Sequence, residues 1–278
     1  MKHLVLCCCI AACTLTAYAQ ERNWYINAGI GPINYLGDLR EQQFTANQMQ
    51  FNGSLGLTYQ HTQHFSANLS LTLGSLKAHD SENGEKWFYR NLSFQSSLFE
   101  VSTTLQYDLF DIQQPDEDNI AELNPQKITP YVFAGIGLFH FNPYTYDLSG
   151  KKVYLQPLGT EGQASPYSLW SVSFPVGVGV KYALNKTMMV SAEINFRKTL
   201  TDYMDDVSQH QYVDTVQLLA THGPEAASLS YRADEIPDTK YEFWGYRGNP
   251  DKKDVYYSVM LRFSYQLFTS RPKFLYGY

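Results

Sequence analysis

Apolar and polar residues alternate along most of this chain, and the longest such run, 254–268, lies near its C-terminus. Every second position from Val255 to Leu267 is apolar, whereas Ser258, Arg262 and Ser264 lie between them. A period of two sustained this far predicts a β-strand much longer than the usual ~5–6 residues. Such a strand needs a neighbour on each edge, and we expect the first strand of the chain to pair with it and close a barrel.

Seven further runs with the same period precede it. They predict strands over 24–31, 51–59, 65–74, 99–107, 131–141, 170–182 and 188–197. Pro32 is expected to end the first strand, because proline cannot donate to a ladder. Short and long connections broadly alternate, which is typical of an up-and-down barrel with turns at one end and loops at the other. The acidic segment 111–126 would be an enlarged turn.

The two faces of the predicted strand 65–74 distinguish two kinds of barrel. One face is apolar and the other carries only small or uncharged polar residues: Phe65, Ala67, Leu69, Leu71 and Leu73 against Ser66, Asn68, Ser70, Thr72 and Gly74. A soluble barrel turns its apolar face inward and presents charged residues to water. An outer-membrane barrel does the opposite. We therefore predict an all-β fold, an eight-stranded antiparallel transmembrane β-barrel of the outer-membrane type with long extracellular loops.

Aromatic residues on the predicted outward face fall at two heights. Those near the turns are Trp24, Tyr59, Phe65, Tyr107, Tyr131, Tyr182 and Tyr265, and those near the loops are Phe51, Phe141, Trp170, Phe196 and Tyr257. Two such rings, about 8–12 residues apart, are typical of the aromatic girdles at the two surfaces of a bilayer.

Residues 1–19 have the pattern of a secretory signal peptide, with Lys2 before an apolar run and small residues at Ala17 and Ala19. Cleavage after Ala19 would leave one domain, 20–278, for export to the outer membrane. Lipidation of Cys13, in a lipobox-like sequence, is the alternative. All four cysteines lie in this segment, so the exported chain would have no thiolate for a disulfide, a metal site or catalysis.

Charge and hydropathy exclude other classes of partner. Loss of Lys2 with the signal would change the formal net charge from −6 to −7. No basic block remains, so nucleic acid is not an expected partner. No apolar run reaches about 18 residues, so the sequence predicts no membrane-spanning helix, and lipid is expected to contact the strands instead.

Five charged residues face the predicted lumen: Glu100, Lys181, Glu193, Arg197 and Arg262. Charges inside so narrow a barrel must be compensated. Glu193 and Arg262 lie at similar height on adjacent strands, and we expect them to form an ion pair. The network would fill the lumen as a structural plug, and a proton or solute pathway is the alternative.

Two other groups of residues are candidate chemical sites. Asp202, Asp205 and Asp206 could bind Ca²⁺ through clustered carboxylates, but their spacing matches no known cation loop, which favours solvated or capping roles. His140 and His210 have no nucleophile partner by spacing, so the sequence predicts no enzyme and no catalytic residue. No cofactor or metal is expected.

Several segments, taken in order, resemble one known family. They are Gly37-Asp38-Leu39, the run 129–137 followed by Phe141-Asn142-Pro143, the run 197–207 that contains Asp202, Asp205 and Asp206, and Arg247-Gly248-Asn249. Together they resemble the PorG-like outer-membrane barrels of the type IX secretion system, found in Bacteroidetes.

The resemblance implies a non-enzymatic outer-membrane component that contacts the periplasmic ring of that machine, formed by a PorK-like lipoprotein and a PorN-like protein. The expected docking surfaces are the segments 111–126 and 269–278. The alternative is a small porin-like or surface-binding barrel that acts through its last loop, 199–253.

Overall fold

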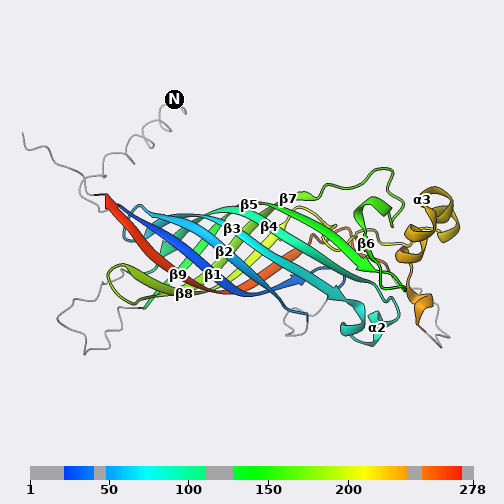
Figure 1. The fold of residues 1–278 in the computed structure, drawn as a ribbon, viewed down its shortest axis with the longest axis horizontal. Coiled ribbons are helices and arrows are strands. Elements are labelled where there is room, and N and C mark those ends of the chain that lie inside the picture. The colour runs from blue at the N-terminus through cyan, green and yellow to red at the C-terminus, as the bar shows by residue number, and fades with distance from the viewer. Residues whose placement is uncertain (1–21, 41–47, 111–127, 237–245, 271–278) are drawn as a thin grey trace, which may run out of the picture.

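The alternating runs form eight long strands that close into one antiparallel barrel (Figure 1). The computed structural model describes residues 22–40, 48–110, 128–236 and 246–270. The barrel strands are β1 (Arg22–Leu36), β2 (Gln50–Gln60), β3 (Phe65–His79), β4 (Ser93–Asp108), β5 (Ile128–Tyr146), β7 (Trp170–Ala183), β8 (Met188–Thr199) and β9 (Val255–Ser270). A ninth strand, β6 (Lys152–Tyr154), pairs only with the end of β5 and was not predicted.

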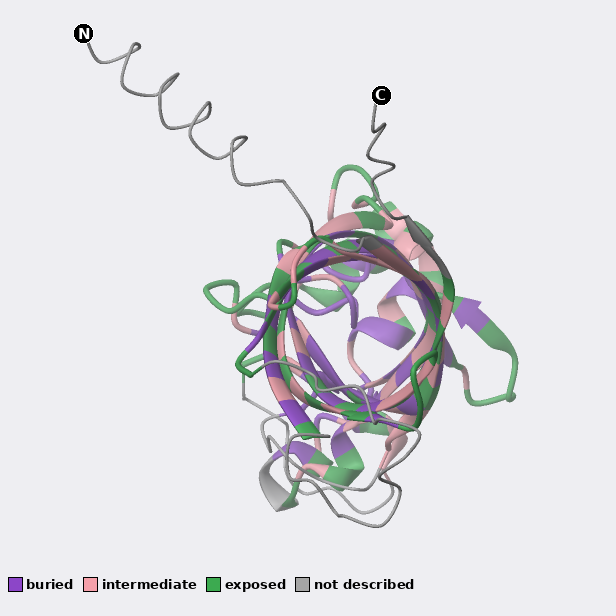
Figure 2. Ribbon diagram, turned by 90° about the vertical axis from the view of Figure 1, so that its left-hand side faces the viewer, coloured by how far each residue is buried: buried purple, intermediate pink, exposed green. Residues whose placement is uncertain are grey.

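First and last strands close the barrel, as predicted. β1 lies between β2 and β9, with Ile26 opposite Tyr265, and β4 pairs with β5 on the other side. The ring of strands is continuous when viewed along the axis (Figure 2). The connections 61–64 and 184–187 lie at what we call the turn end, where β4 also ends and β5 begins. The described residues of the loops 37–49, 80–92, 147–169 and 200–254 lie at the loop end.

Pro32 does not end the first strand, which continues to Leu36. Pro32 lies opposite Phe51 of β2, but the ladder between β1 and β9 is interrupted at Gly31 and Pro32 and resumes at Ile33. The missing proline N–H therefore falls at a break in the pairing, where it costs no ladder hydrogen bond.

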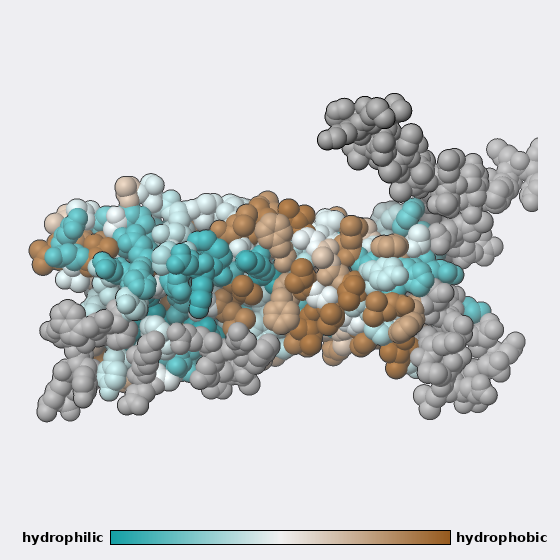
Figure 3. Space-filling model, turned by 180° about the vertical axis from the view of Figure 1, so that it is seen from behind, coloured by the Kyte–Doolittle hydropathy of each residue, from teal (hydrophilic) through white to brown (hydrophobic). Residues whose placement is uncertain are grey.

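The polarity of the wall is that of a membrane-spanning barrel, as predicted. On β3, Leu69 and Leu73 are 50% and 56% exposed, whereas Ser66 and Thr72 are 6% and 1% exposed. On the face shown in Figure 3, brown apolar side chains gather over the barrel wall, and hydrophilic residues predominate toward the loop end. The apolar stretch of β3 is nine residues long, which gives about 23 Å for a strand tilted by about 40°, close to the ~25 Å apolar band of outer-membrane barrels.

This polarity reverses along the same strands beyond the band. On β3 the outward series changes from Leu73 to Ser75 and Lys77, while the inward series changes from Thr72 to Leu76 and Ala78, both fully buried. The apolar core of the molecule therefore lies at the loop end. Its buried residues come from strands and loops, including Ile33, Leu39, Leu76, Leu92, Phe94, Leu98, Phe139, Phe141, Leu155, Met204, Val207, Leu229 and Tyr256. The loop end has the apolar-in arrangement of a water-soluble domain.

Two aromatic residues of β5 were assigned to the wrong face. Tyr131 and Phe141 point inward and are buried, whereas most of the other residues of the two predicted rings lie on the outer wall. Glycines explain the inward rings, since a Cβ on Gly179 would lie 2.4 Å from Cζ of Tyr131, and a Cβ on Gly177 would lie 2.4 Å from Cζ of Phe133. Tyr257 also departs from its ring, because it is only 3% exposed.

The last loop contains a helix that the sequence analysis missed. α3 (Thr215–Ser230) starts at Asp214, whose Oδ1 accepts from the backbone N–H groups of Val216 and Gln217, and it is interrupted at Gly223. A short helix, α2 (Glu85–Phe88), and the 3-10 turns η1 (Asp80–Glu82), η3 (Gln156–Leu158) and η4 (Ala233–Glu235) complete the loop end. No helix in the described ranges is long and apolar enough to cross a membrane. The predicted turn 111–126 and signal segment 1–19 lie outside those ranges.

Candidate functional site

Three ion pairs occupy the lumen. Arg197 Nε lies 3.0 Å from Glu100 Oε1, Arg262 Nη2 lies 2.9 Å from Glu193 Oε2, and Lys181 Nζ lies 2.6 Å from Asp108 Oδ2. The predicted pairing of Glu193 with Arg262 is thus present. All five sequence-predicted lumen charges lie inside the barrel, and the three cations balance the three carboxylates.

Asp108 was missed, although it continues the inward series of β4 after Gln106. The predicted strand ends one residue earlier, at Tyr107. The signal that would have found Asp108 is the phase of the alternation, because Glu100, Ser102, Thr104 and Gln106 share its parity.

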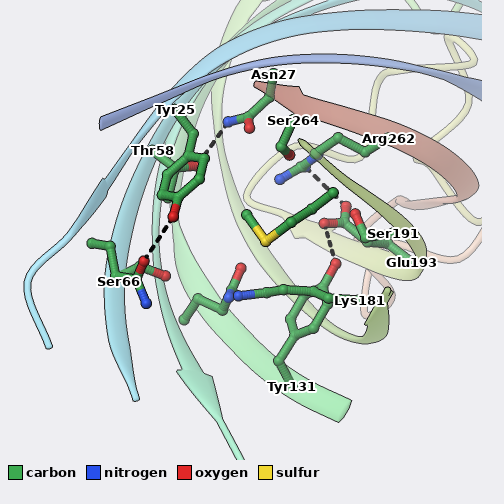
Figure 4. Close-up of a pocket in the computed structure, with 13 residues that line it drawn as sticks. Tyr25, Asn27, Thr58, Ser66, Tyr131, Lys181, Ser191, Glu193, Arg262 and Ser264 are labelled. Carbon is green, nitrogen blue, oxygen red and sulfur yellow. Dashed lines mark hydrogen bonds and ion pairs between the residues drawn. The ribbon is translucent and has the colours of Figure 1, made fainter. Parts of the chain in front are cut away.

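Each lumen carboxylate also accepts a bond from a neutral donor. Tyr131 donates a hydrogen bond to Glu193 Oε1 at 2.6 Å (Figure 4). Gln106 donates one to Asp108 Oδ1 at 2.6 Å. Ser173 and Tyr256 donate to Glu100 Oε2. Buried charges are tolerated when they are paired and their remaining lone pairs are satisfied. The three carboxylates in this lumen meet both conditions, whereas Nε of Arg262 is buried without a hydrogen-bond partner among the described residues.

The space left in the lumen is small. Two of the cavities between the described inward side chains have volumes of about 30 Å³ and 10 Å³. Figure 4 shows the larger, bordered by Tyr25, Asn27, Lys181 and Glu193. Cavities of this size hold isolated waters. At the loop end, inward aromatic rings such as Phe139, Phe141 and Tyr256 follow, all fully buried. At these two places the described side chains therefore leave no solute-sized space.

The four loops meet around Arg247, which is fully inside the protein. Its Nε donates to Glu161 Oε1 at 3.0 Å, its Nη1 donates to the carbonyl of Ser230 at 2.7 Å, and its Nη2 donates to Thr160 Oγ1 at 3.1 Å. Nη2 also donates to the carbonyl of Asp206 at 3.2 Å. Arg247 thereby joins loop 147–169 to loop 200–254.

Arg90 extends this junction to the other two loops. Its Nε and Nη2 donate to the two oxygens of Asp80 at 2.7 and 2.6 Å, in a fork geometry that carboxylates favour. Nη2 also donates to the carbonyl of Asp38 at 2.8 Å, and Nη1 donates to that of Arg247 at 2.6 Å. We call this assembly of Asp38, Asp80, Arg90, Glu161, Asp202, Asp205, Asp206, Arg247 and Asp254 the cap cluster.

Asp202, Asp205 and Asp206 are buried, so the solvated role is wrong, whereas the capping role agrees with Asp205, whose Oδ1 accepts from the backbone N–H of Val207 at 3.0 Å. Asp206 accepts from Thr160 and, at 2.7 Å, from Tyr167, and Asp202 accepts from Ser208 at 2.8 Å. Burial raises the pKa of Asp206 to about 6 despite the nearby Arg247. Burial, and then the charge of Asp254, raises the pKa of Asp205 well above its usual range.

Tyr35 lies between two of these acids. Its hydroxyl is 2.6 Å from Asp205 Oδ2 and 2.8 Å from Asp254 Oδ1, and all three side chains are buried. A phenol has one proton to donate. Both contacts can be hydrogen bonds only if one carboxyl is protonated and donates to the phenol oxygen. This geometry agrees with the raised pKa values of Asp205 and Asp254.

The remaining motif residues also contribute to the cap. Asn249 donates its backbone N–H to Asp38 Oδ2 at 2.9 Å. A Cβ on Gly37 would lie 1.9 Å from the Tyr35 hydroxyl oxygen, and one on Gly248 would lie 2.7 Å from Asp38 Oδ2. These two positions require glycine because other groups approach the backbone closely. The loop motif residues thus meet at one site, whereas the motif run 129–137 lies in strand β5 of the barrel. Asp80, Arg90 and Glu161 were not recognised from the sequence.

Within the described residues, no group of three or more His, Cys, Asp or Glu side chains is arranged to hold a metal ion. His140 lies against the ring of Trp170, with centroids 5.0 Å apart, and Nδ1 of His210 lies 3.2 Å from the carbonyl of Gly248. Neither histidine is hydrogen-bonded to a serine in the described part of the chain.

Comparison with known proteins assigns a family. Residues 2–219 match the family model described as Domain of unknown function (DUF6089). The chain belongs to the DUF6089 family. In this DUF6089 member the match includes β1 to β8 and ends within α3, so the closing strand β9 lies beyond it. No curated protein matches the sequence.

Several solved outer-membrane proteins are similar in fold. Neisserial surface protein A has 13% identity, with 88% of this chain and 97% of that chain covered and a TM-score of 0.44. Ail of Yersinia pestis, in complex with the heparin analogue sucrose octasulfate, has 8% identity, 90% and 100% coverage and a TM-score of 0.40. The N-terminal barrel domain of Pseudomonas aeruginosa OprF has 12% identity, 89% and 100% coverage and a TM-score of 0.36.

Proposed function

We propose that this protein is a non-conducting, non-enzymatic barrel of the outer membrane that anchors a periplasmic assembly. The observation that carries the proposal is the sealed interior: three balanced ion pairs fill the lumen, and the cap cluster joins the loops above them. A transport barrel needs an open path, and a surface enzyme needs an accessible catalytic group. A sealed and rigid barrel is suited to holding something else at the membrane.

The partner we propose is the periplasmic ring of a type IX secretion system, formed by a PorK-like lipoprotein and a PorN-like protein. Support comes from the motif resemblance to PorG-like barrels. To contact a periplasmic ring, the barrel would have its turn end in the periplasm and its loop end outside the cell, as is usual for outer-membrane barrels. Docking would use the segments 111–126 and 269–278, because β4, β5 and β9 have ends there. Except for Thr269 and Ser270 of β9, both segments lie outside the described residues.

Co-purification after mild cross-linking tests this partner. The full chain should retain the two ring proteins, and a variant without 111–126 and 271–278 should lose them while remaining in the outer membrane. A matched variant, in which a Gly-Ser linker replaces 237–245 of the last loop, should keep them. Retention by the first variant, or loss by the second, would contradict the proposed docking surfaces.

The second candidate is a surface-binding barrel, favoured by the ordered loop end with α3 and the 3-10 turns. Loss of surface binding after the 237–245 replacement, with ring association absent throughout, would favour it. A small porin is the third possibility. Single-channel recording in planar bilayers separates it, because we expect no stepwise conductance from the sealed barrel.

N-terminal sequencing of the exported chain would distinguish cleavage after Ala19 from lipidation of Cys13.

A further inference from the structure

A groove with a volume of about 390 Å³ lies on the outer wall of the barrel, across β3, β4, β5 and β6. Its floor is low because the outward residues of β3 and β4 there are Ser75 and Ser97. Tyr144, Lys152 and Tyr154 border it on one side, and Gln50 and Lys77 border it on the other. None of these residues belongs to the lumen network or the cap cluster.

The groove is positively charged, although the chain as a whole is acidic. Its lining includes Lys77 and Lys152 but no Asp or Glu, whereas the formal net charge of the chain is −6. Neither lysine forms an ion pair with any described residue. The adjacent Lys151, outside the groove, pairs with Glu225 at 2.8 Å. Two uncompensated ammonium groups in one depression favour an anionic ligand.

Aromatic rings hold one of these lysines in position. Nζ of Lys152 lies 3.6 Å from the ring centroid of Tyr144 and 4.8 Å from that of Tyr154. Tyr144 is itself fixed, because its hydroxyl donates to Gln95 at 2.9 Å. Cation–π contacts orient the ammonium group without neutralising its charge. Lys152 is therefore held at the groove and keeps its charge available to an anion.

The groove lies directly beside the apolar band. Ser75 and Ser97 are each two positions from an outward apolar residue, Leu73 and Phe99, which are at the loop-end edge of the band. Two residues of a strand span about 7 Å. In a bilayer that covers the band, the groove would open at the level of the lipid headgroups, with the apolar wall continuing below it.

We propose that this groove binds the phosphate-bearing headgroup of an anionic lipid in the outer leaflet. Lys77 and Lys152 would donate to the phosphate, and Gln50 and Gln95 could donate to neighbouring polar groups. The acyl chains would lie along Leu73 and Phe99. This continuity with the band favours a lipid over a soluble phosphate. The inference rests on the proposed outer-membrane location.

Lipid retention by the purified full chain tests the inference. The chain would be inserted into nanodiscs that contain diphosphoryl lipid A or phosphatidylethanolamine alone, and bound lipid measured by native mass spectrometry. We expect selective retention of diphosphoryl lipid A, reduced about tenfold or more in Lys77→Ala/Lys152→Ala, since each cation near a charged membrane surface contributes on the order of 1 kcal/mol. Lys151→Ala is the matched control and should retain the lipid.

Three other outcomes would overturn the inference. Equal retention by wild type and the double variant would remove the groove from binding. Full competition by millimolar inorganic phosphate would identify a site for free phosphate instead of lipid. In both cases the chain inserts, so the proposed location stands. A chain that does not insert into bilayers would overturn the location and the groove together.

Discussion

Arg90 donates a hydrogen bond of 2.6 Å to the backbone carbonyl of Arg247, 157 positions away in the sequence. The two side chains are 1% and 2% exposed. Arg90 binds Asp80 and the backbone at Asp38, while Arg247 binds Glu161 and the backbone at Ser230. This contact therefore joins the described parts of all four loops, and the bond from the Asn249 N–H to Asp38 adds a second connection.

Replacing Arg90 with alanine should loosen all four loops. The substitution leaves the Asp80 carboxylate buried without its partner, and breaking a buried pair in this way typically costs about 3–5 kcal/mol. Hydrogen exchange should accelerate at the amides of 80–92 and also at those of 147–169 and 246–254, which Arg90 reaches through Arg247. The exchange of strand amides within the apolar band should not change.

Lys151→Ala is the matched control for this change, because it breaks an exposed ion pair at the same end of the barrel. It should leave exchange in all four loops as in the wild type. If Arg90→Ala accelerated exchange only at 80–92, the loops would open independently, and the connection through Arg247 would be refuted.

The barrel could be predicted because a repeating physical signal specifies it. Between Phe65 and Gly74, a two-residue period places the leucines of β3 outside and its serines inside without knowledge of any distant contact. The same signal gave wrong strand ends. We ended the third strand at Gly74 because the alternation stops there, whereas the structure continues to His79 with the apolar residues on the opposite face. The change of phase at Gly74 marks the edge of the apolar band.

The cap cluster could be predicted only in part. The aspartates of loop 200–254 and the motif at Arg247 attract attention as local patterns, but nothing local connects them to Arg90 or Glu161. Arg90 lies 157 positions from Arg247 in the sequence, and Glu161 lies 86 positions from it. Loops have no periodicity from which such contacts could be predicted. The face of β5 was also ambiguous, because it has apolar residues on both sides, and Gly177 and Gly179 on the next strand decide it.

A double-mutant cycle should measure strong coupling between Glu193 and Arg262. Arg262→Met leaves the Glu193 carboxylate without its cation, and Glu193→Gln leaves the guanidinium without its anion, so each single change should lower the unfolding free energy by about 3–5 kcal/mol. The double variant should lose clearly less than the sum. Urea unfolding in detergent micelles gives the four free energies.

The exposed pair Lys151 and Glu225 provides the control cycle and should show no measurable coupling. Additive losses for Glu193→Gln and Arg262→Met would mean that the lumen pair contributes as two separate polar residues, and the filled lumen would need another explanation.

The cap should become more stable on mild acidification. The pKa of Asp206 is raised from 3.8 to about 6 by burial, so the folded cap binds a proton that the unfolded chain has lost above about pH 4. The stabilisation is fully present below pH 4 and is lost as the pH rises through 6. At 1.36 kcal/mol per pKa unit, the free energy of unfolding changes by about 3 kcal/mol over this range. The raised pKa of Asp205 extends the loss to higher pH.

Hydrogen exchange in 200–210, corrected for intrinsic rates, should therefore slow between pH 7.5 and pH 4.5. Asp206→Asn should reduce this dependence, because an amide does not titrate. The control Asp214→Asn changes an exposed helix cap and should retain it. Protection that increased with pH would contradict the raised pKa of Asp206. It would also contradict the protonated carboxyl group inferred beside the Tyr35 hydroxyl.

A single methyl group at Gly179 should destabilise the barrel through Tyr131. The Cβ of Gly179→Ala would lie 2.4 Å from Cζ of Tyr131 and 2.6 Å from its hydroxyl oxygen, so the ring must move and release Glu193. Overpacking of this kind typically costs about 1–3 kcal/mol, measurable by urea unfolding. Gly53→Ala is the control, because its Cβ meets nothing nearer than 3.8 Å. Adding Tyr131→Leu should remove most of the penalty of Gly179→Ala, and an undiminished penalty would show that the ring is not its cause.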